Sequence, residues 1–280
     1  MTNYCGGFFL LGISYFYAMI LASPHDLAYS PKKIISLVPS QTELLYALGL
    51  EAETIAITKF CVHPKTWFQS KTRIGGTKTI NIDKVISLRP DLIIANKEEN
   101  VKEQVEMLAE HFPVWVSDVN TLDEAYQMVQ DIGILTKTEN IAAELVSAIK
   151  HMFNIFIQNN NIKKRISTAY LIWKDPYMTV GRDSFISDLM GVAGLENVFH
   201  EQLRYPEITL SKLKQLNCKL VLLSSEPYPF KEKHIEELQR ELPGVKIILV
   251  DGELFSWYGS RLLHSPAYFE KLRSEIENDL

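Results

Sequence analysis

Short apolar runs recur along the chain, separated by helical patterns of apolar and polar positions. The first run, Ile34–Val38, is continuous and rich in β-branched residues, which predicts a buried strand. An apolar helix follows it and stops at Gly49. Further runs of strand length are Thr54–Thr58, Leu92–Ala95, Val114–Val116, Ile166–Ile172, Leu220–Leu223 and Lys246–Val250. Strands that alternate with helices predict parallel α/β units.

Helical spacing marks the segments between these runs. The expected helices are Ile82–Leu88, Glu98–His111, Ser184–Ala193, Leu210–Leu216, Lys231–Glu241 and a last helix from about Pro266. Two Ser/Thr-x-x-Glu sequences, Ser40 to Glu43 and Thr121 to Glu124, predict capping boxes. In such a box the hydroxyl and the carboxylate each satisfy a free amide at the start of the helix.

One helical pattern is much longer than the others. Apolar residues recur at helical spacing from Glu139 to Asn159 without an interrupting Gly or Pro. Such a helix is a rigid rod, not a flexible linker. It divides the chain into a segment 1–31, an N-terminal α/β lobe over 32–137, a linking helix over 138–161 and a C-terminal α/β lobe over 162–280.

The two predicted lobes share a sequence pattern. Residues 81–98 (NIDKVISLRPDLIIANKE) and 209–226 (TLSKLKQLNCKLVLLSSE) align without a gap at an offset of 209 − 81 = 128. Each contains a short helix and an apolar strand and ends in a glutamate. Two copies this far apart predict paired domains. The expected fold is α/β, with two Rossmann-like lobes that contain parallel sheets, one long rigid helix that joins them, and a ligand cleft between them.

Composition supports this organisation and argues against nucleic acid as a partner. The 280 residues are 46% hydrophobic and 22% charged, which is ordinary for a globular protein of two domains. The formal net charge is −5 and no basic stripe is visible, so we expect no nucleic acid partner. Cys5, Cys61 and Cys218 form no even framework and are predicted to be free thiols. We expect a monomer.

The N-terminal segment contains an apolar stretch, Phe8–Ala22. It is shorter than the ~20 residues that a membrane span needs. It fits the apolar part of a secretory signal, with Ile20 and Ala22 at the −3 and −1 positions of a cleavage site, although no basic residue precedes it. We therefore expect a periplasmic or exported protein, and a cytoplasmic one if this stretch is not a signal.

The chain lacks the common sequence signatures of α/β enzymes. It has no Gly-x-Gly-x-x-Gly after a strand, no phosphate-binding loop, no Gly-x-Ser-x-Gly elbow and no His-Glu-x-x-His zinc motif. We expect no catalytic residue, no metal ligand and no covalent cofactor. One enzymatic alternative stays open, a two-domain enzyme whose acid and base groups are the cleft carboxylates Glu98, Asp118, Glu226 and Asp251.

Aromatic and small residues are concentrated in the loops that follow the predicted strands. Such loops bind ligands in α/β folds, and aromatic faces with a few polar groups suit a large planar ligand. A single aromatic residue is more often part of the core, as we expect of Trp115, but Trp67, Trp173 and Trp257 are predicted to line the cleft. The candidate ligand-binding residues are Pro39, Ser40, Lys59, Phe60, Trp67, Thr77, Lys78, Trp173, Arg182, Tyr205, Tyr228, Phe255, Trp257, Tyr258 and Arg261.

Four segments carry a resemblance to a known family: IISLVPSQTE (34–43), GGTKTINIDKV (75–85), LRPDLI (88–93) and WYGSR (257–261). With the long helix, they make the chain similar, from about Lys32 onward, to the periplasmic cobalamin-binding component of ABC importers. This component is one of the helical-backbone metal receptors, which also bind ferric siderophores and haem. The resemblance implies a shallow cleft that changes little on binding, a cobalamin-like corrinoid as ligand and an ABC transporter permease as partner.

The resemblance also implies how the protein docks. In the family an acidic residue on each lobe pairs with arginines of the permease. Asp83 occupies the first position, whereas the repeat offset places Ser211 at the second, where Glu207 is the nearest substitute. The N-terminal Asp-x-x-Gly-Arg hairpin of the family has no counterpart in His25–Pro31.

A rival ligand stays open within the same fold. The protein is alternatively a receptor for a ferric siderophore or for haem. Siderophore sites in this family use several arginines, and the candidates here are Arg73, Arg182, Arg204 and Arg261.

Overall fold

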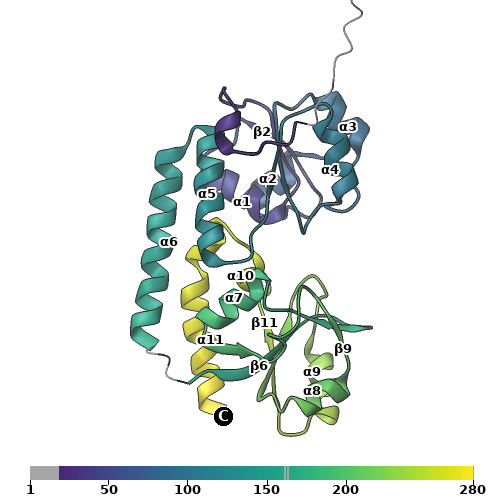
Figure 1. The fold of residues 1–280 in the computed structure, drawn as a ribbon, viewed down its shortest axis with the longest axis vertical. Coiled ribbons are helices and arrows are strands. Elements are labelled where there is room, and N and C mark those ends of the chain that lie inside the picture. The colour runs from purple at the N-terminus through teal and green to yellow at the C-terminus, as the bar shows by residue number, and fades with distance from the viewer. Residues whose placement is uncertain (1–18, 161, 163, 280) are drawn as a thin grey trace, which may run out of the picture.

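The computed structural model describes residues 19–279 except 161 and 163. Two α/β lobes lie one above the other along the long axis, and one long helix runs beside both (Figure 1). The sheet of the first lobe is parallel, with strand order β3-β2-β1-β4-β5. Its strands are β1 (Ile34–Ser36), β2 (Thr54–Ile57), β3 (Thr72–Arg73), β4 (Leu92–Asn96) and β5 (Val114–Ser117).

Alternating side chains of this sheet enter two separate cores, because successive residues of a strand point to opposite faces. Ile34 and Ile94 pack with helices on one face, whereas Ile35 and Ile93 pack with helices on the other. The first face is covered by α1 (Pro39–Ala47), α2 (Lys65–Ser70) and α5 (Leu122–Thr136), and the second by α3 (Ile82–Leu88) and α4 (Lys102–Ala109). The 3₁₀ turn η1 (Pro24–Asp26) contacts α5.

The sheet of the second lobe is mixed, with strand order β11-β10-β6-β7-β9, and β8 pairs with β6 off this path. Strands β6, β8, β10 and β11 pair in parallel, whereas β7 is antiparallel to β6 and β9. The expectation of parallel sheets is therefore only partly met here, because a short turn joins β6 to β7 and a hairpin needs no helical crossover. The strands are β6 (Ile166–Trp173), β7 (Tyr177–Thr179), β8 (Leu195–Asn197), β9 (Glu207–Ile208), β10 (Leu220–Ser224) and β11 (Lys246–Val250).

Helices cover both faces of this second sheet. One core contains side chains of α8 and α9, and the other joins the sheet to α7 and α11. The elements are α7 (Phe185–Val192), α8 (Leu210–Gln215), α9 (Glu232–Glu241), α10 (Glu253–Ser256), η2 (Ser260–Leu263) and α11 (Ser265–Asp279).

The long helix α6 (Glu139–Asn160) is confirmed and lies against elements of both lobes. Its buried stripe of Ala142, Val146, Ile149, Phe153 and Phe156 packs on α5, η2 and α11. These helices and both sheets share one continuous hydrophobic core. The lobes are thus joined by packed side chains along the whole of α6, and not by a bare connection.

Gly133 permits the close contact between α5 and α6. A Cβ atom at this position would lie 2.6 Å from the Cβ of Ala142, which is too close for any side chain. The Thr121 to Glu124 capping box at the start of α5 is confirmed, with the Glu124 amide donating to Thr121 Oγ1 at 3.2 Å.

Two predicted helix starts are wrong. The predicted box from Ser40 to Glu43 does not form: Val38 is the N-cap of α1, Pro39 is its first residue, and no side chain caps it. Helix α4 begins at Lys102 and not at Glu98, because Asn96 Oδ1 accepts the amides of Glu98 and Glu99 at 2.9 and 3.1 Å and holds a turn there. Both errors concern glutamates that reach the second lobe.

The predicted signal, Phe8–Ala22, lies outside the described residues except for its last four. Of these, Ile20 pairs in parallel with Val114, at the free edge of β5. No helix of residues 19–279, in their described part, is long and apolar enough to cross a membrane. Cys61 and Cys218 are buried free thiols, as predicted, and Cys5 falls among the residues that are not described.

Candidate functional site

Residues that follow the strands of both sheets meet at the boundary between the lobes. Glu98 after β4 and His63 after β2 come from the first lobe, and both contact residues of the second. Open α/β sheets bind ligands outside the carboxyl ends of their strands. The boundary between the lobes is therefore the candidate site.

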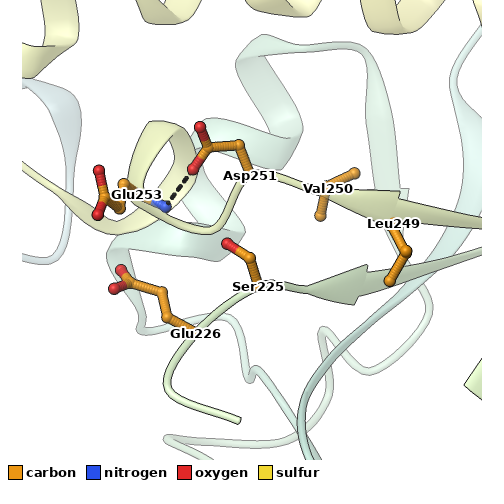
Figure 2. A pocket seen from close by; sticks show the side chains of 6 residues that line it. All are labelled: Ser225, Glu226, Leu249, Val250, Asp251 and Glu253. Atoms are coloured by element: carbon orange, nitrogen blue, oxygen red, sulfur yellow. Dashed lines mark hydrogen bonds between the residues drawn. The ribbon is translucent and has the colours of Figure 1, made fainter. Parts of the chain in front are cut away.

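A pocket of about 520 Å³ adjoins this boundary (Figure 2). It is formed where β10 and β11 end, and the side chains of Glu226 and Glu253 extend beyond both strand ends. The Asp251 carboxylate accepts the Glu253 amide at 3.1 Å and fixes the start of α10. The lining residues are Ser225, Glu226, Leu249, Val250, Asp251 and Glu253.

Glu226 is the most perturbed acid of this pocket. Its Oε1 accepts a hydrogen bond from Ser256 Oγ at 2.7 Å and another from Trp257 Nε1 at 2.8 Å. Burial raises the pKa of the Glu226 carboxyl to about 7, and the nearby Glu253 charge adds to the effect against these two donors. Glu226 is therefore part protonated and part ionised near neutral pH.

Arg261 joins the two lobes and contacts Glu253, one of the residues that line this pocket. Its Nε and Nη2 donate to both carboxylate oxygens of Glu43 in α1 at 2.8 and 2.7 Å, and its Nη1 lies 2.6 Å from Glu253 Oε2. The guanidinium also stacks on Trp257 at 4.8 Å from the ring centroid. Only 14% of the Arg261 side chain is exposed, so its guanidinium group is mostly covered by these partners. His63 approaches the same Glu253 from the first lobe at 3.3 Å.

A second bridge crosses the boundary, and we call Glu98, Arg204 and Tyr205 the clasp. Arg204 Nη1 donates to Glu98 Oε1 at 2.7 Å, and the Tyr205 hydroxyl donates to Glu98 Oε2 at 2.6 Å. Burial, and then the Glu98 charge, raises the pKa of Tyr205 above its ordinary value, so the hydroxyl keeps its proton. Arg204 Nη1 also lies 3.3 Å from Asn120 Oδ1.

The structure brings several predicted residues together at this boundary. Tyr258 is buried and bonds the Ser40 side chain of the opposite lobe. Trp257, Arg261 and Tyr205 take part in the contacts described above. Burial raises the pKa of Tyr258 well above its ordinary value, with the charges of the neighbouring glutamates adding to it.

Other predicted residues lie in the same group of loops, some of them exposed and some buried. Trp173 is 40% exposed and meets Tyr228 edge to face, with ring centroids 5.6 Å apart. Phe60 is 51% exposed, and the Lys59 ammonium lies 5.1 Å from its ring centroid. In the neighbouring loop Thr77 is buried, its carbonyl oxygen accepting from Asn100 at 3.1 Å, and Lys78 bonds the carbonyl oxygen of Glu98. Pro39, which is half-buried, starts α1.

Three predicted residues occupy places that differ from the expected cleft loops. Trp67 lies within α2, fully buried in the core, because its ring fills the space beside Tyr46. Phe255 is part of α10 and packs on Phe269 with ring centroids 4.8 Å apart. Arg182 lines a separate pocket of about 400 Å³ along α7. Trp115 is buried in β5, as predicted.

Sequence reasoning missed Glu43, Glu253 and His63 as members of the boundary. The spacing from Ser40 to Glu43 predicts a local cap, but Glu43 pairs with Arg261, which is 218 residues away in the sequence, and no local pattern indicates so distant a partner. The adjoining WYGSR segment was the available signal, since it contains Arg261 itself. No group of three or more His, Cys, Asp or Glu residues suited to a metal ion occurs within the described chain.

The predicted docking residues belong to α3, β9 and α8, and these elements lie on the edge of the molecule opposite α6 (Figure 1). Asp83 is exposed in the first turn of α3, which Asn81 caps through the Lys84 amide at 3.0 Å. Glu207 is exposed in β9, and Ser211 is exposed in the first turn of α8. The two short helices α3 and α8 are equivalent in the repeat and lie at the outer ends of the two lobes.

Comparisons with known proteins agree with this architecture. A family model described as "Periplasmic binding protein" matches residues 34–247. An uncharacterised ABC transporter substrate-binding lipoprotein of Bacillus subtilis, YvrC, is 28% identical over 89% of this chain and 81% of the relative. A vitamin B12-binding protein of Pectobacterium carotovorum is 23% identical over 83% of this chain and 85% of the relative.

Solved structures match the fold over most of their length. The periplasmic vitamin B12 binding protein BtuF of Vibrio cholerae superposes with a TM-score of 0.75 at 21% identity, covering 85% of this chain and 95% of that one. A periplasmic haem-binding protein of Pseudomonas aeruginosa gives 0.73 at 16% identity, covering 86% and 92%. The two-lobe α/β fold with its long helix is therefore shared by receptors of different ligands.

Proposed function

This chain belongs to the periplasmic binding protein family, and on that premise we propose that it binds a cobalamin-like corrinoid in the cleft between its lobes. As a family member it is the substrate-binding protein of an ABC transporter, and its partner is the permease of such a transporter. These proteins are not enzymes, so the alternative of a two-domain enzyme is wrong.

One observation carries the choice of ligand: the four candidate arginines do not form a cluster of free guanidinium groups. Arg204 and Arg261 are held by carboxylates of the cleft. Arg73 stacks on Phe68 at 4.5 Å, and Arg182 lines the separate pocket along α7. A ferric siderophore with several negative charges, or the two propionates of haem, needs more than one cation, and a single arginine released from Glu98 would leave most of that charge uncompensated beside Glu226.

Exposed aromatic faces support a large and partly apolar ligand. Phe60 after β2 and Trp173 at the end of β6 present exposed rings, and the half-buried Tyr228 after β10 packs edge to face on Trp173. Such faces bind flat apolar surfaces, and the carboxylates and hydroxyls between them accept hydrogen bonds from a ligand that is rich in amide N–H groups. A corrinoid has both features, since carboxamide side chains surround its ring.

Delivery follows from the same premise. We assign permease docking to Asp83, with Glu207 as the contact of the second lobe, because both residues are exposed and their elements, α3 and β9, lie on the edge opposite α6. Rim charges of this kind steer association and are sensitive to salt. We further assign the protein to the periplasm or the outer side of the membrane, and we expect it to act as a monomer.

Calorimetric titration tests the ligand directly. Cyanocobalamin, haemin and a ferric catecholate siderophore are each titrated into the purified protein. We expect one site for cyanocobalamin per chain and recovery of the ligand unchanged. Tight binding of haemin or of the siderophore, with no heat from cyanocobalamin, would move the assignment to the rival ligand.

A further inference from the structure

We propose that Arg204 and Tyr205 are the donors that select an oxygen acceptor of the ligand, and that Glu98 competes with the ligand for them. The inference rests on the proposed function in one respect, that a ligand enters the cleft between the lobes. The selected group is a carboxamide carbonyl or a phosphate oxygen, both of which a corrinoid carries. In this structure the Glu98 carboxylate takes both donors across the boundary.

The Tyr205 hydroxyl is suited to donate rather than to accept. It lies 2.6 Å from Glu98 Oε2, and its raised pKa keeps it protonated throughout the physiological range. Arg204 donates to the other oxygen at 2.7 Å, so the two side chains present a pair of donors to one carboxylate. Such a pair binds a group that offers two acceptor positions, either the two lone pairs of one carboxamide oxygen or two oxygens of one phosphate.

Arg204 is positioned by its own lobe and not by Glu98. Its backbone has φ +56°, in the left-handed region that non-glycine residues rarely adopt, and its amide donates to Asp183 Oδ1 at 2.6 Å. The other carboxylate oxygen of Asp183 lies 3.5 Å from Arg204 Nε. Asp183 therefore holds the arginine while Nη1 remains directed across the cleft, and the donor stays in place when Glu98 leaves.

Glu98 differs from Arg204, because its backbone is fixed by its own lobe while its carboxylate is held by the other lobe. Asn96 accepts its amide, and Lys78 bonds its carbonyl oxygen, both within the first lobe. The carboxylate itself bonds only residues of the second lobe among the described partners. It is a quarter exposed, and the Arg204 side chain is 43% exposed, so the released carboxylate regains water readily. Partly exposed ion pairs of this kind contribute little net stability.

Titration of clasp variants with cyanocobalamin tests the inference. We expect Glu98→Ala to bind roughly 3- to 10-fold more tightly than the wild type, because the ligand no longer displaces a carboxylate. Glu98→Gln, which keeps the size and loses the charge, should gain a smaller factor. Adding Tyr205→Phe to Glu98→Ala should weaken binding by roughly 3- to 10-fold, because the selecting donor is then absent.

Glu103→Gln is the matched control, because it removes a carboxylate from an exposed position in the first turn of α4, in the same lobe, with no hydrogen bond to Arg204 or Tyr205 among the described contacts. An equal gain in this control would assign the effect to general charge and overturn the inference. Unchanged or weaker binding by Glu98→Ala would overturn it as well. Thermal unfolding of each variant checks that the fold is intact.

The outcomes separate this inference from the proposed ligand. If the wild type ignores cyanocobalamin and binds haemin or the ferric siderophore, the corrinoid assignment fails, and the same variants test the clasp with the ligand that binds. If cyanocobalamin binds but Glu98→Ala brings no gain, the clasp fails alone. If neither the wild type nor Glu98→Ala binds any of the three ligands, the corrinoid assignment and the clasp both fail.

Discussion

Replacing Glu226 by Gln is expected to change how stability depends on pH. The carboxyl has a pKa of about 7 in the folded protein against an ordinary value of 4.5, chiefly because burial disfavours its charge. The folded state therefore binds this proton more tightly than the unfolded chain does. The resulting stabilisation is fully present below the ordinary pKa and is lost as pH rises through about 7.

The two pKa values fix the size of this effect. A difference between about 7 and 4.5 corresponds to about 3 kcal/mol, and about 2 to 3 kcal/mol of it falls between roughly pH 5 and 8. Glu253 faces the carboxylate and adds repulsion, whereas Ser256 and Trp257 donate to it and offset part of the cost. A Gln side chain keeps an acceptor for these donors and carries no charge.

Urea unfolding at several pH values measures the effect. The wild type should lose about 2 to 3 kcal/mol relative to Glu226→Gln between roughly pH 5 and 8, so the variant becomes the more stable protein at alkaline pH. Glu236→Gln, at an exposed position of α9, removes a similar charge from the same lobe and serves as control. If the wild type and Glu226→Gln lose stability in parallel, the carboxylate is not destabilised by its surroundings.

Three further outcomes follow from the described contacts. Glu43→Gln should cost about 1 to 3 kcal/mol in urea unfolding, because Arg261 loses a paired carboxylate, whereas Glu241→Gln in an exposed pair should cost under about 1 kcal/mol. Trp67→Ala should cost about 3 to 5 kcal/mol as a core cavity, whereas Trp173→Ala should weaken ligand binding with little loss of stability; the reverse pattern would contradict their placement. Asp83→Asn should leave ligand affinity intact and lower transport in reconstituted vesicles, more at low salt; normal transport would refute its docking role.

The fold was accessible to sequence reasoning where periodic patterns are long. Helix α6 has its buried residues at helical spacing over many turns, and β4 and β10 are continuous apolar runs that the repeat offset aligned. Strands β3 and β9 have two residues each and contain no period to detect. Their pairing depends on neighbouring strands that bring them into register, and this is tertiary information.

The site was less accessible because its contacts join distant parts of the chain. Both Ser40-x-x-Glu43 and Thr121-x-x-Glu124 have the spacing of a capping box, yet only the second forms. In the first, Pro39 occupies the opening position of the helix, and Glu43 is drawn away by a guanidinium from the other lobe. A local motif predicts a local bond only when no stronger distant partner competes for the same side chain.

The two glutamates that end the repeated segments show how similar lobes produce an asymmetric site. Glu98 and Glu226 are equivalent at the offset of 128. Glu98 follows β4, which pairs with β1, and Glu226 follows β10, which pairs with β6. Glu98 lies at a turn that directs it across the boundary to Arg204 and Tyr205, where its charge is compensated. Glu226 bonds Ser256 and Trp257 of its own lobe, which provide two neutral donors and no cation. Equivalent positions therefore have different surroundings: one carboxylate is paired with donors of the opposite lobe, and burial raises the pKa of the other to about 7, so that a change of pH near neutrality alters its charge.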